Sequence, residues 1–326
     1  MELPTVSVII AVRNEANNIP ALINQLNQLD YPDEKLEIFI GNDDSSDSTL
    51  RILQECKSPI IQIFDISAEV SGFKGKMNVL AQLIENASGE YLILTDADIY
   101  FDSDWVKAHV RSISQDAGLA GGMTGIIPDS QLSKMQHVDM MQYQGMLKVL
   151  IDLEIPIAAI GNNLIVKQSA INKVGGYPNI KPSIVEDVAL LHVLKKSGTK
   201  IQLNYNPSTY IETKGSGSVV ELLQQRRRWY SATKWVPAWL KLLIILKLLF
   251  LPTILLLIQF NPWFVLIFTV KLGLTYMFVN EVVKSIKKRI VLLDILQYEL
   301  YEPLIYFSTF IYSLLPFKIT WKGRVY

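Results

Sequence analysis

Two aspartates, Asp96 and Asp98, stand one residue apart directly after the run Tyr91–Thr95. Two carboxylates at the end of a buried strand lie close together and repel each other unless a cation neutralises them. Mg²⁺ and Mn²⁺ favour carboxylate and phosphate oxygens, and such an ion can bridge a diphosphate and neutralise it as a leaving group. Helix caps and loops also produce this short pattern. Its position after the strand favours a metal site at Asp96 and Asp98.

A second acidic pair, Glu186 and Asp187, precedes the amphipathic pattern of residues 188–196. Either carboxylate could serve as a general base that removes a proton from a hydroxyl group. Acidic residues are also favoured in the first turn of a helix by the helix dipole, without any catalytic role. The residues by themselves leave both interpretations open.

Further polar groups suit a nucleotide. Asp43 lies in the polar run Asn42–Thr49, and a carboxylate beyond a strand end can accept the imide N–H of uracil or bind ribose hydroxyls. Lys74 and Lys76 flank Gly75 just before a predicted helix, where a lysine suits phosphate. The alternative for both lysines is a solvated position with no ligand.

The segment Gln225-Arg-Arg-Arg-Trp229 places Gln225, Arg228 and Trp229 at positions i, i+3 and i+4, on one face of a helix. Arginine there could hold a diphosphate with two hydrogen bonds, and tryptophan could stack on an acceptor. Arginine and tryptophan are also common at membrane surfaces, and we assign this anchoring role to Arg226 and Arg227.

The elements that would position these residues follow an α/β pattern. Apolar, β-branched runs at residues 6–12, 36–40, 60–66 and 91–94 predict strands that are buried on both faces. Helical patterns lie at about residues 17–29, from about residue 47, and at about 75–86 and 219–230. This alternation predicts a mostly parallel sheet, with a ligand at the carboxyl ends of its strands.

The charges are divided between the two parts of the chain. The 326 residues carry 31 basic and 31 acidic side chains, but residues 1–220 have a net charge of −9 and residues 221–326 a net charge of +9. This division does not fit a uniformly basic nucleic-acid-binding protein, so we expect no nucleic-acid partner. It fits an enzyme that docks on an anionic membrane surface.

The tail is strongly apolar. Residues 236–280 contain only Lys241, Lys247 and Lys271 as charges, and Pro252, Asn261 and Pro262 divide them into two stretches near the length that spans a bilayer. A basic loop at 284–289 and a shorter apolar stretch at about 304–317 follow. The positive-inside tendency favours two spans plus an interfacial or re-entrant segment. Core helices of a soluble domain are the alternative.

The single cysteine, Cys56, excludes an intramolecular disulfide and a cysteine-rich zinc site. The N-terminal residues lack the basic start and long apolar run of a signal peptide. We therefore expect the first part of the chain in the cytoplasm, at the inner face of the cell membrane.

In this order, the motifs resemble those of the family 2 glycosyltransferases with the GT-A fold, and the resemblance covers about residues 4–230. The QxxRW motif and the apolar tail are similar to those of the membrane-bound branch of the family. The segments that carry the resemblance are residues 6–15, 42–49, 86–91, Asp96-Ala-Asp98, Gly161-Asn-Asn163, Gly175-Gly-Tyr177, Glu186-Asp187 and Gln225–Trp229, with a weaker likeness in Ile319–Arg324.

The resemblance implies a GT-A domain at residues 1–230 and a membrane-associated region at 231–326. It implies an inverting transfer of a sugar from a nucleotide-sugar, expected to be a UDP-sugar, to a lipid or lipid-linked saccharide. By the same resemblance, Asp187 is the base next to Glu186, and Asp98 binds Mg²⁺ or Mn²⁺ beside Asp96. The implied donor-binding residues are Glu15, Asn42, Asp43, Lys74 or Lys76, Asp96, Gln225, Arg228 and Trp229.

Three other functions remain open. A processive polysaccharide synthase subunit would use the same site, with a partner protein completing a channel. A catalytically dead, nucleotide-sugar-binding membrane scaffold would bind the nucleotide without turnover. A metal-dependent nucleotidyltransferase could share the sheet and the acidic pair, but would not need an acceptor-side base or the membrane motif.

Overall fold

The computed structural model describes residues 2–70 and 72–325. Contacts divide the chain into two compact units. The first unit holds residues 1–124 and 147–213, and the second holds residues 125–146 and 214–326. The helix that carries Gln225 therefore groups with the segments that follow it. The predicted boundary between a catalytic domain at residues 1–230 and a membrane-associated region at 231–326 stays a prediction.

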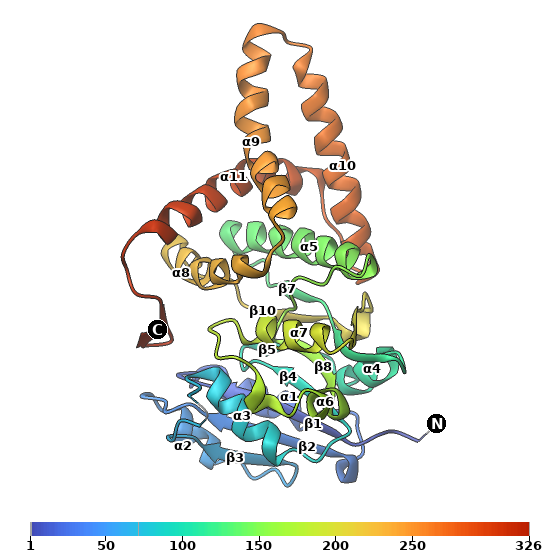
Figure 1. The fold of residues 1–326 in the computed structure, drawn as a ribbon, viewed down its shortest axis with the longest axis vertical. Coiled ribbons are helices and arrows are strands. Elements are labelled where there is room, and N and C mark those ends of the chain that lie inside the picture. The colour runs from blue at the N-terminus through green and yellow to red at the C-terminus, as the bar shows by residue number, and fades with distance from the viewer. Residues whose placement is uncertain (1, 71, 326) are drawn as a thin grey trace. The chain divides into compact units, whose positions relative to one another are not determined.

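The first unit is built on a seven-stranded sheet with the order β3-β2-β1-β4-β8-β6-β9 (Figure 1). The four strands β3, β2, β1 and β4 run parallel, β8 is antiparallel to β4 and β6, and β9 is parallel to β6. This confirms the predicted mostly parallel sheet. The strands are β1 (Val6–Val12), β2 (Leu36–Asn42), β3 (Ile61–Asp65), β4 (Tyr91–Thr95), β6 (Ala117–Gly121), β8 (Asn163–Lys167) and β9 (Lys200–Leu203).

Helices cover the sheet, and its central strands are buried on both faces, as their continuous apolar runs predict. Val8, Ile9 and Ile10 of β1 are all completely buried. Gly41 allows a helix to approach β2 closely, because a Cβ atom there would come within 2.3 Å of Val79. The helices of this unit are α1 (Ile19–Leu26), α2 (Thr49–Gln54), α3 (Lys76–Asn86), α4 (Trp105–Ser112), α6 (Gln168–Lys173) and α7 (Glu186–Lys196).

A second, three-stranded sheet has the order β5-β10-β7, and its strand β5 directly follows β4 in the chain. β5 (Ile99–Tyr100) pairs antiparallel with β10 (Ile211–Thr213), so that Ile99 lies opposite Thr213. β7 (Thr124–Ile126) begins where the chain passes from the first unit to the second. The pairing of β5 with β10 fixes the segment that directly follows Asp98.

The second unit is helical (Figure 1). It contains most of α5 (Gln131–Asp152), a long helix that the sequence patterns did not predict, together with α8 (Val219–Tyr230), which they predicted correctly. The chain then forms α9 (Ala238–Phe260), α10 (Phe264–Ser285) and α11 (Leu292–Leu314), and ends in a hairpin of β11 (Thr320–Trp321) and β12 (Arg324–Val325).

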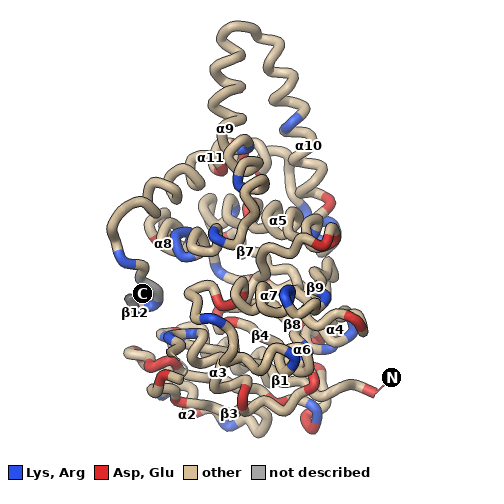
Figure 2. Tube along the Cα trace, in the orientation of Figure 1, with Lys and Arg blue, Asp and Glu red and all other residues tan. Residues whose placement is uncertain are grey.

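Two helices, α9 with 23 residues and α10 with 22, are long and apolar enough to cross a membrane by length and composition. They form a hairpin that carries few charges over most of its length (Figure 2). The chain turns at 261–263, whereas Pro252 lies inside α9 and does not divide it, contrary to the sequence prediction. Apolar helices tolerate an internal proline when neighbouring groups satisfy the freed carbonyl.

The third apolar segment differs from its prediction, because α11 starts at Leu292 rather than near residue 304. Its buried side carries acidic residues, which hide the apolar pattern, while leucine and phenylalanine side chains lie exposed on its other side. Each buried acid pairs with a lysine of another helix in the same unit. The pairs are Lys134–Asp294 at 2.6 Å, Lys247–Glu302 at 2.5 Å, and Lys271–Glu299.

Candidate active site

A lysine joins two of the predicted acidic residues. The ammonium nitrogen of Lys76 lies 2.7 Å from Asp96 and 2.8 Å from Glu186. Lys76 is the first residue of α3, Asp96 follows β4, and Glu186 is the first residue of α7. Burial alone would lower the pKa of Lys76, but the charges of Asp96 and Glu186 raise it well above its usual range. Lys76 is therefore a fixed cation at the carboxyl end of β4.

The second candidate lysine has a different environment. Lys74 is exposed, whereas Lys76 is largely buried. Gly75 between them has a φ of 61°, a left-handed conformation that favours glycine and turns the chain into α3. The structure thus brings Lys76, and not Lys74, together with the acidic residues.

Asp98 lies beside this cluster and carries a poorly compensated charge. Burial and the neighbouring charge of Asp96 raise the pKa of Asp98 to about 6, although a hydrogen bond with Thr213 and the charge of Lys76 lower it in part. A divalent cation would stabilise the ionised form of such a carboxylate. Asp98, with Asp96 next to it, therefore suits the predicted metal and could hold it.

Both carboxylate oxygens of Asp187 accept backbone hydrogen bonds. Oδ2 accepts the N–H of Gly161 at 2.9 Å, and Oδ1 accepts the N–H of Val188 at 2.8 Å. Asp187 is partly exposed, while Glu186 is buried at 7% exposure. The two hydrogen bonds hold the carboxylate of Asp187 in a position where it can accept a proton. Glu186 instead forms an ion pair with Lys76.

The predicted nucleoside-binding residues follow the neighbouring strands β1 and β2. Glu15 and Asp43 are both buried, at 5% exposure each. The side-chain amide of Asn42 donates to Asp65 at 2.8 Å, and these two residues are opposite each other at the ends of β2 and β3. The carboxyl ends of four parallel strands therefore carry polar groups at one edge of the sheet.

Sequence reasoning did not assign Asp65 to this edge, and it placed Arg13 there, after the first strand, without giving it a role. The guanidinium group of Arg13 donates to the backbone carbonyls of Asp43 and Asp44 and so joins the ends of β1 and β2. Asp65 is the last residue of β3, a position equivalent to those of the other candidates at their strand ends. Its position at the end of a predicted strand could have identified Asp65 from the sequence.

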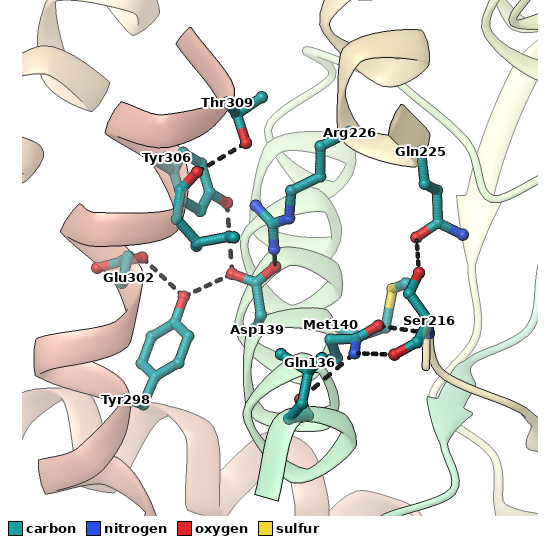
Figure 3. A network of polar contacts seen from close by, with 12 residues as sticks. Gln136, Asp139, Met140, Ser216, Gln225, Arg226, Tyr298, Glu302, Tyr306 and Thr309 are labelled. Atoms are coloured by element: carbon teal, nitrogen blue, oxygen red, sulfur yellow. Dashed lines mark hydrogen bonds and ion pairs between the residues drawn. The ribbon is translucent and has the colours of Figure 1, made fainter. Parts of the chain in front are cut away.

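The motif on α8 belongs to the second unit. The Ser216 hydroxyl lies 3.4 Å from the side-chain oxygen of Gln225, and Trp229 is 38% exposed. The predicted membrane-anchoring role of Arg226 was wrong, because Arg226 is buried and forms an ion pair with Asp139 (Figure 3). Arg227 donates to the carbonyl of Leu315 at 2.8 Å.

The sheet, with polar residues at the ends of its strands, resembles that of the GT-A-like glycosyltransferases. The chain belongs to glycosyl transferase family 2, since the model of that family matches residues 7–174, more than half of the chain. A second model, glycosyl transferase family group 2, matches residues 91–283 and so extends into the helical unit.

Curated relatives include lipid- and polysaccharide-forming enzymes. A beta-monoglucosyldiacylglycerol synthase from Trichormus variabilis is 26% identical over 238 residues, which cover 70% of this chain and 48% of the relative. A poly-beta-1,6-N-acetyl-D-glucosamine synthase from Staphylococcus aureus is 30% identical over 233 residues, which cover 70% of this chain and 54% of the relative. The chain spans about half the length of these relatives.

Solved structures share the fold at low sequence identity. The mannosyltransferase PcManGT from Pyrobaculum calidifontis, in complex with GDP-Man and Mn²⁺, has a TM-score of 0.52 and 17% identity, covering 72% of this chain and 65% of that protein. S. aureus TarS residues 1–349, in complex with UDP-GlcNAc, has a TM-score of 0.50 and 17% identity, covering 66% and 59%. These likenesses support the GT-A fold.

Proposed function

We propose that this protein is an inverting, metal-dependent glycosyltransferase that transfers a sugar from a UDP-sugar to a lipid or lipid-linked saccharide. The observation that carries the proposal is the cluster at the end of β4, where Lys76 joins Asp96 and Glu186 beside the half-buried Asp98. A fixed cation and a metal-binding carboxylate are the groups that a nucleoside diphosphate requires at its phosphates.

The donor would bind along the carboxyl edge of the sheet. Glu15, Asn42 and Asp43 would contact the nucleoside, and Asp96 and Lys76 would lie near ribose and diphosphate. Within the described residues, no three His, Cys, Asp or Glu side chains are grouped to hold a metal ion. Asp98 would hold Mg²⁺ or Mn²⁺, with Asp96 next to it. The bound metal would neutralise the departing diphosphate.

Asp187 would be the general base. It would remove the proton of the acceptor hydroxyl while that oxygen attacks the anomeric carbon and the bond to the diphosphate breaks on the opposite face. The single displacement inverts the anomeric configuration. Gln225, Arg228 and Trp229 of α8 would contact diphosphate and acceptor, with Arg228 supplying a further positive charge.

The acceptor class is supported by the tail and by one relative. α9 and α10 are candidate membrane spans, and the beta-monoglucosyldiacylglycerol synthase is named for a lipid product. We propose that the enzyme acts at the cytoplasmic face of the cell membrane. The poly-beta-1,6-N-acetyl-D-glucosamine synthase relative supports a second candidate, a polysaccharide synthase subunit that extends its product processively.

The first experiment is thermal unfolding of the detergent-purified chain with UDP or GDP, each with and without Mn²⁺. A ligand that binds only the folded state raises the apparent stability, by about 2.7 kcal/mol at a hundredfold excess over its Kd. We expect a Mn²⁺-dependent shift with UDP. A shift with GDP alone would exclude the UDP-sugar, and no shift with either nucleotide would favour a degenerate scaffold.

The second experiment measures the transfer itself. Radiolabelled UDP-sugars are incubated with the enzyme and with membrane lipids, and labelled products are separated from unused donor. A single-sugar glycolipid of inverted configuration is the expected product. A long polymer would support the synthase, and transfer at the parent rate by Asp187→Asn would remove Asp187 as the base.

A further inference from the structure

The helix that carries Gln225, Arg228 and Trp229 is held by two polar residues of α5. These residues, Gln136 and Asp139, stand at positions i and i+3 and therefore lie on one face of α5. Both are buried, at 6% and 8% exposure. Figure 3 shows Asp139 directed toward Arg226 of α8 and Gln136 directed toward Ser216, in the loop that precedes α8.

Asp139 is the centre of the first attachment. Its Oδ2 forms an ion pair with Arg226, while its Oδ1 accepts the hydroxyl of Tyr298 at 2.7 Å and lies 3.4 Å from that of Tyr306. The guanidinium group of Arg226 also lies 4.9 Å from the ring centre of Tyr306. The ion pair is thus enclosed between α5, α8 and α11. A buried pair of this kind is sensitive to the loss of either partner.

Gln136 forms the second attachment, through the backbone of Ser216. The Gln136 side chain donates to the carbonyl of Ser216 at 3.0 Å and accepts its N–H at 2.9 Å. The Ser216 hydroxyl in turn lies 3.4 Å from the side-chain oxygen of Gln225. Gln136 therefore fixes the residue that contacts Gln225 itself.

Leu222 is the one fully buried apolar residue among the described residues of α8. Leu222 and Arg226 are the two residues of this helix that are buried, and they stand one turn apart. Because the remaining contacts of a half-exposed helix are weakly directional, hydrogen bonds and ion pairs determine how it is rotated about its axis. Loss of the pair to Asp139 would leave Leu222 as the one buried anchor among the described residues of α8.

We propose that Asp139 and Gln136 are positioning residues for the transfer reaction, which set the rotation of α8 through Arg226 and Ser216 so that Gln225, Arg228 and Trp229 are correctly presented. This inference rests on the proposed function, in which those three residues contact diphosphate and acceptor. In this proposal, Asp139 and Gln136 act through α8 and do not themselves contact substrate. Their effect is on the geometry of reacting groups, and small misplacements of such groups lower rates strongly.

The test uses the full chain in detergent and begins with the parent protein. Absence of transfer by the parent would contradict the proposed function and would leave the positioning role to be judged by hydrogen exchange alone. The variants are Asp139→Asn, Arg226→Gln, the double variant and Gln136→Leu. Each is measured for transfer rate, for the Kd of UDP with Mn²⁺, and for amide exchange of residues 219–230.

We expect Asp139→Asn and Arg226→Gln each to lower kcat by about tenfold or more, with a smaller rise in the Kd for UDP, because the other groups proposed to bind the nucleotide are unchanged. Because both changes break the same pair, the double variant should be no worse than the worse single variant. Amides of α8 should exchange faster, while those of α4, in the other unit, should not change. Multiplicative losses in the double variant, or a parallel loss of UDP affinity, would overturn the proposal.

Asp294→Asn is the matched control. Asp294 is itself buried and forms an ion pair with the more exposed Lys134, which joins α5 to α11. Transfer by Asp294→Asn should stay near the parent rate, and an equal loss would show that Asp139 acts only through the stability of the unit. If Asp139→Asn does not fold, Gln136→Leu tests the positioning role, because it leaves the Asp139–Arg226 ion pair intact. Unchanged transfer and unchanged amide exchange of α8 in Gln136→Leu would refute that role.

Discussion

Asp187 and Gly161 lie so close together that a side chain at position 161 would press against Asp187. The N–H of Gly161 donates to Oδ2 of Asp187 at 2.9 Å, and a Cβ atom built on Gly161 would stand 3.0 Å from Cβ and 3.1 Å from Oδ2 of Asp187. Glycine at position 161 therefore allows the backbone to hold the carboxylate at short range. The proposed base is placed by the backbone of a distant segment as well as by its own helix.

The substitution Gly161→Ala should displace Asp187, because the new methyl group is tighter against its Cβ than ordinary contacts allow. We expect the transfer rate to fall by about tenfold or more, with UDP affinity retained, as measured by initial rates and by titration of UDP in the presence of Mn²⁺. Gly273→Ala is the control, since a Cβ atom there has no neighbour within 4 Å. Equal rates for both variants would argue against this role of Gly161.

Replacing Asp187 by asparagine keeps the shape of the side chain but removes its ability to accept a proton. Transfer by Asp187→Asn should fall by at least about a hundredfold, the usual contribution of a general base. Binding of UDP with Mn²⁺ should be retained, because the residues that we propose for the nucleotide are unchanged. The measurement is single-turnover transfer. A variant that has lost UDP binding as well would assign Asp187 to the donor site.

The strands were the most predictable part of the fold. β1 has the predicted bounds because a strand buried on both faces is apolar at every position. α5 was missed because its buried side includes Gln136, Asp139 and Gln144, so its apolar periodicity is weak. The start of α11 was hidden in the same way by acids that find lysine partners in three dimensions. Burial of paired polar groups depends on tertiary contacts that no local pattern records.

In the candidate site too, some features could be predicted from local sequence patterns, whereas others depend on tertiary contacts. Positions at strand ends were found from the chain, because the carboxyl ends of parallel strands share one edge. The choice between Lys74 and Lys76 could not be made, since both flank Gly75. It depends on which side chain reaches Asp96 and Glu186, from segments 20 and 110 residues away in sequence. Arg226 was misassigned because its partner, Asp139, lies on the helix that the sequence patterns did not predict.

Asp98→Asn should remove the metal dependence of nucleotide binding. In the parent we expect Mn²⁺ to tighten the binding of UDP by about tenfold or more, whereas the variant should bind UDP equally with and without Mn²⁺. Isothermal titration with both ligands measures this difference. Asp102→Asn, which changes an exposed carboxylate a few residues further on, should behave as the parent. A variant at position 98 with full metal dependence would place the ion elsewhere.

Lys76→Met should weaken UDP binding more than Lys74→Met does. Without Lys76, the carboxylates of Asp96 and Glu186 would face the diphosphate without a compensating charge, and we expect the Kd for UDP to rise by about tenfold. The exposed Lys74 serves as the matched control, with an expected change within about twofold. Titrations at saturating Mn²⁺ compare the two variants. A larger loss from Lys74→Met would assign the phosphate contact to Lys74.

His109 should make the protein less stable in mild acid. Burial lowers the pKa of His109 from 6.5 to about 4, although the hydrogen bond between its Nε2 and Oδ1 of Asn163 raises it in part. Between these two values, the unfolded chain binds a proton that the folded protein does not. The free energy of unfolding therefore decreases as the pH falls from 6.5 toward 4, by up to about 3 kcal/mol from this residue.

The measurement is the apparent melting temperature of the full chain between pH 7 and pH 4.5, for the parent and for His109→Gln. Glutamine keeps a side-chain donor for Asn163 but does not titrate, so its curve should fall less steeply with acid even if its melting temperature at pH 7 is lower. His192→Gln is the comparison, because His192 is partly buried and its pKa is also lowered, and it should flatten the curve less. Parallel curves for the parent and His109→Gln would show that His109 titrates alike in the folded and unfolded states.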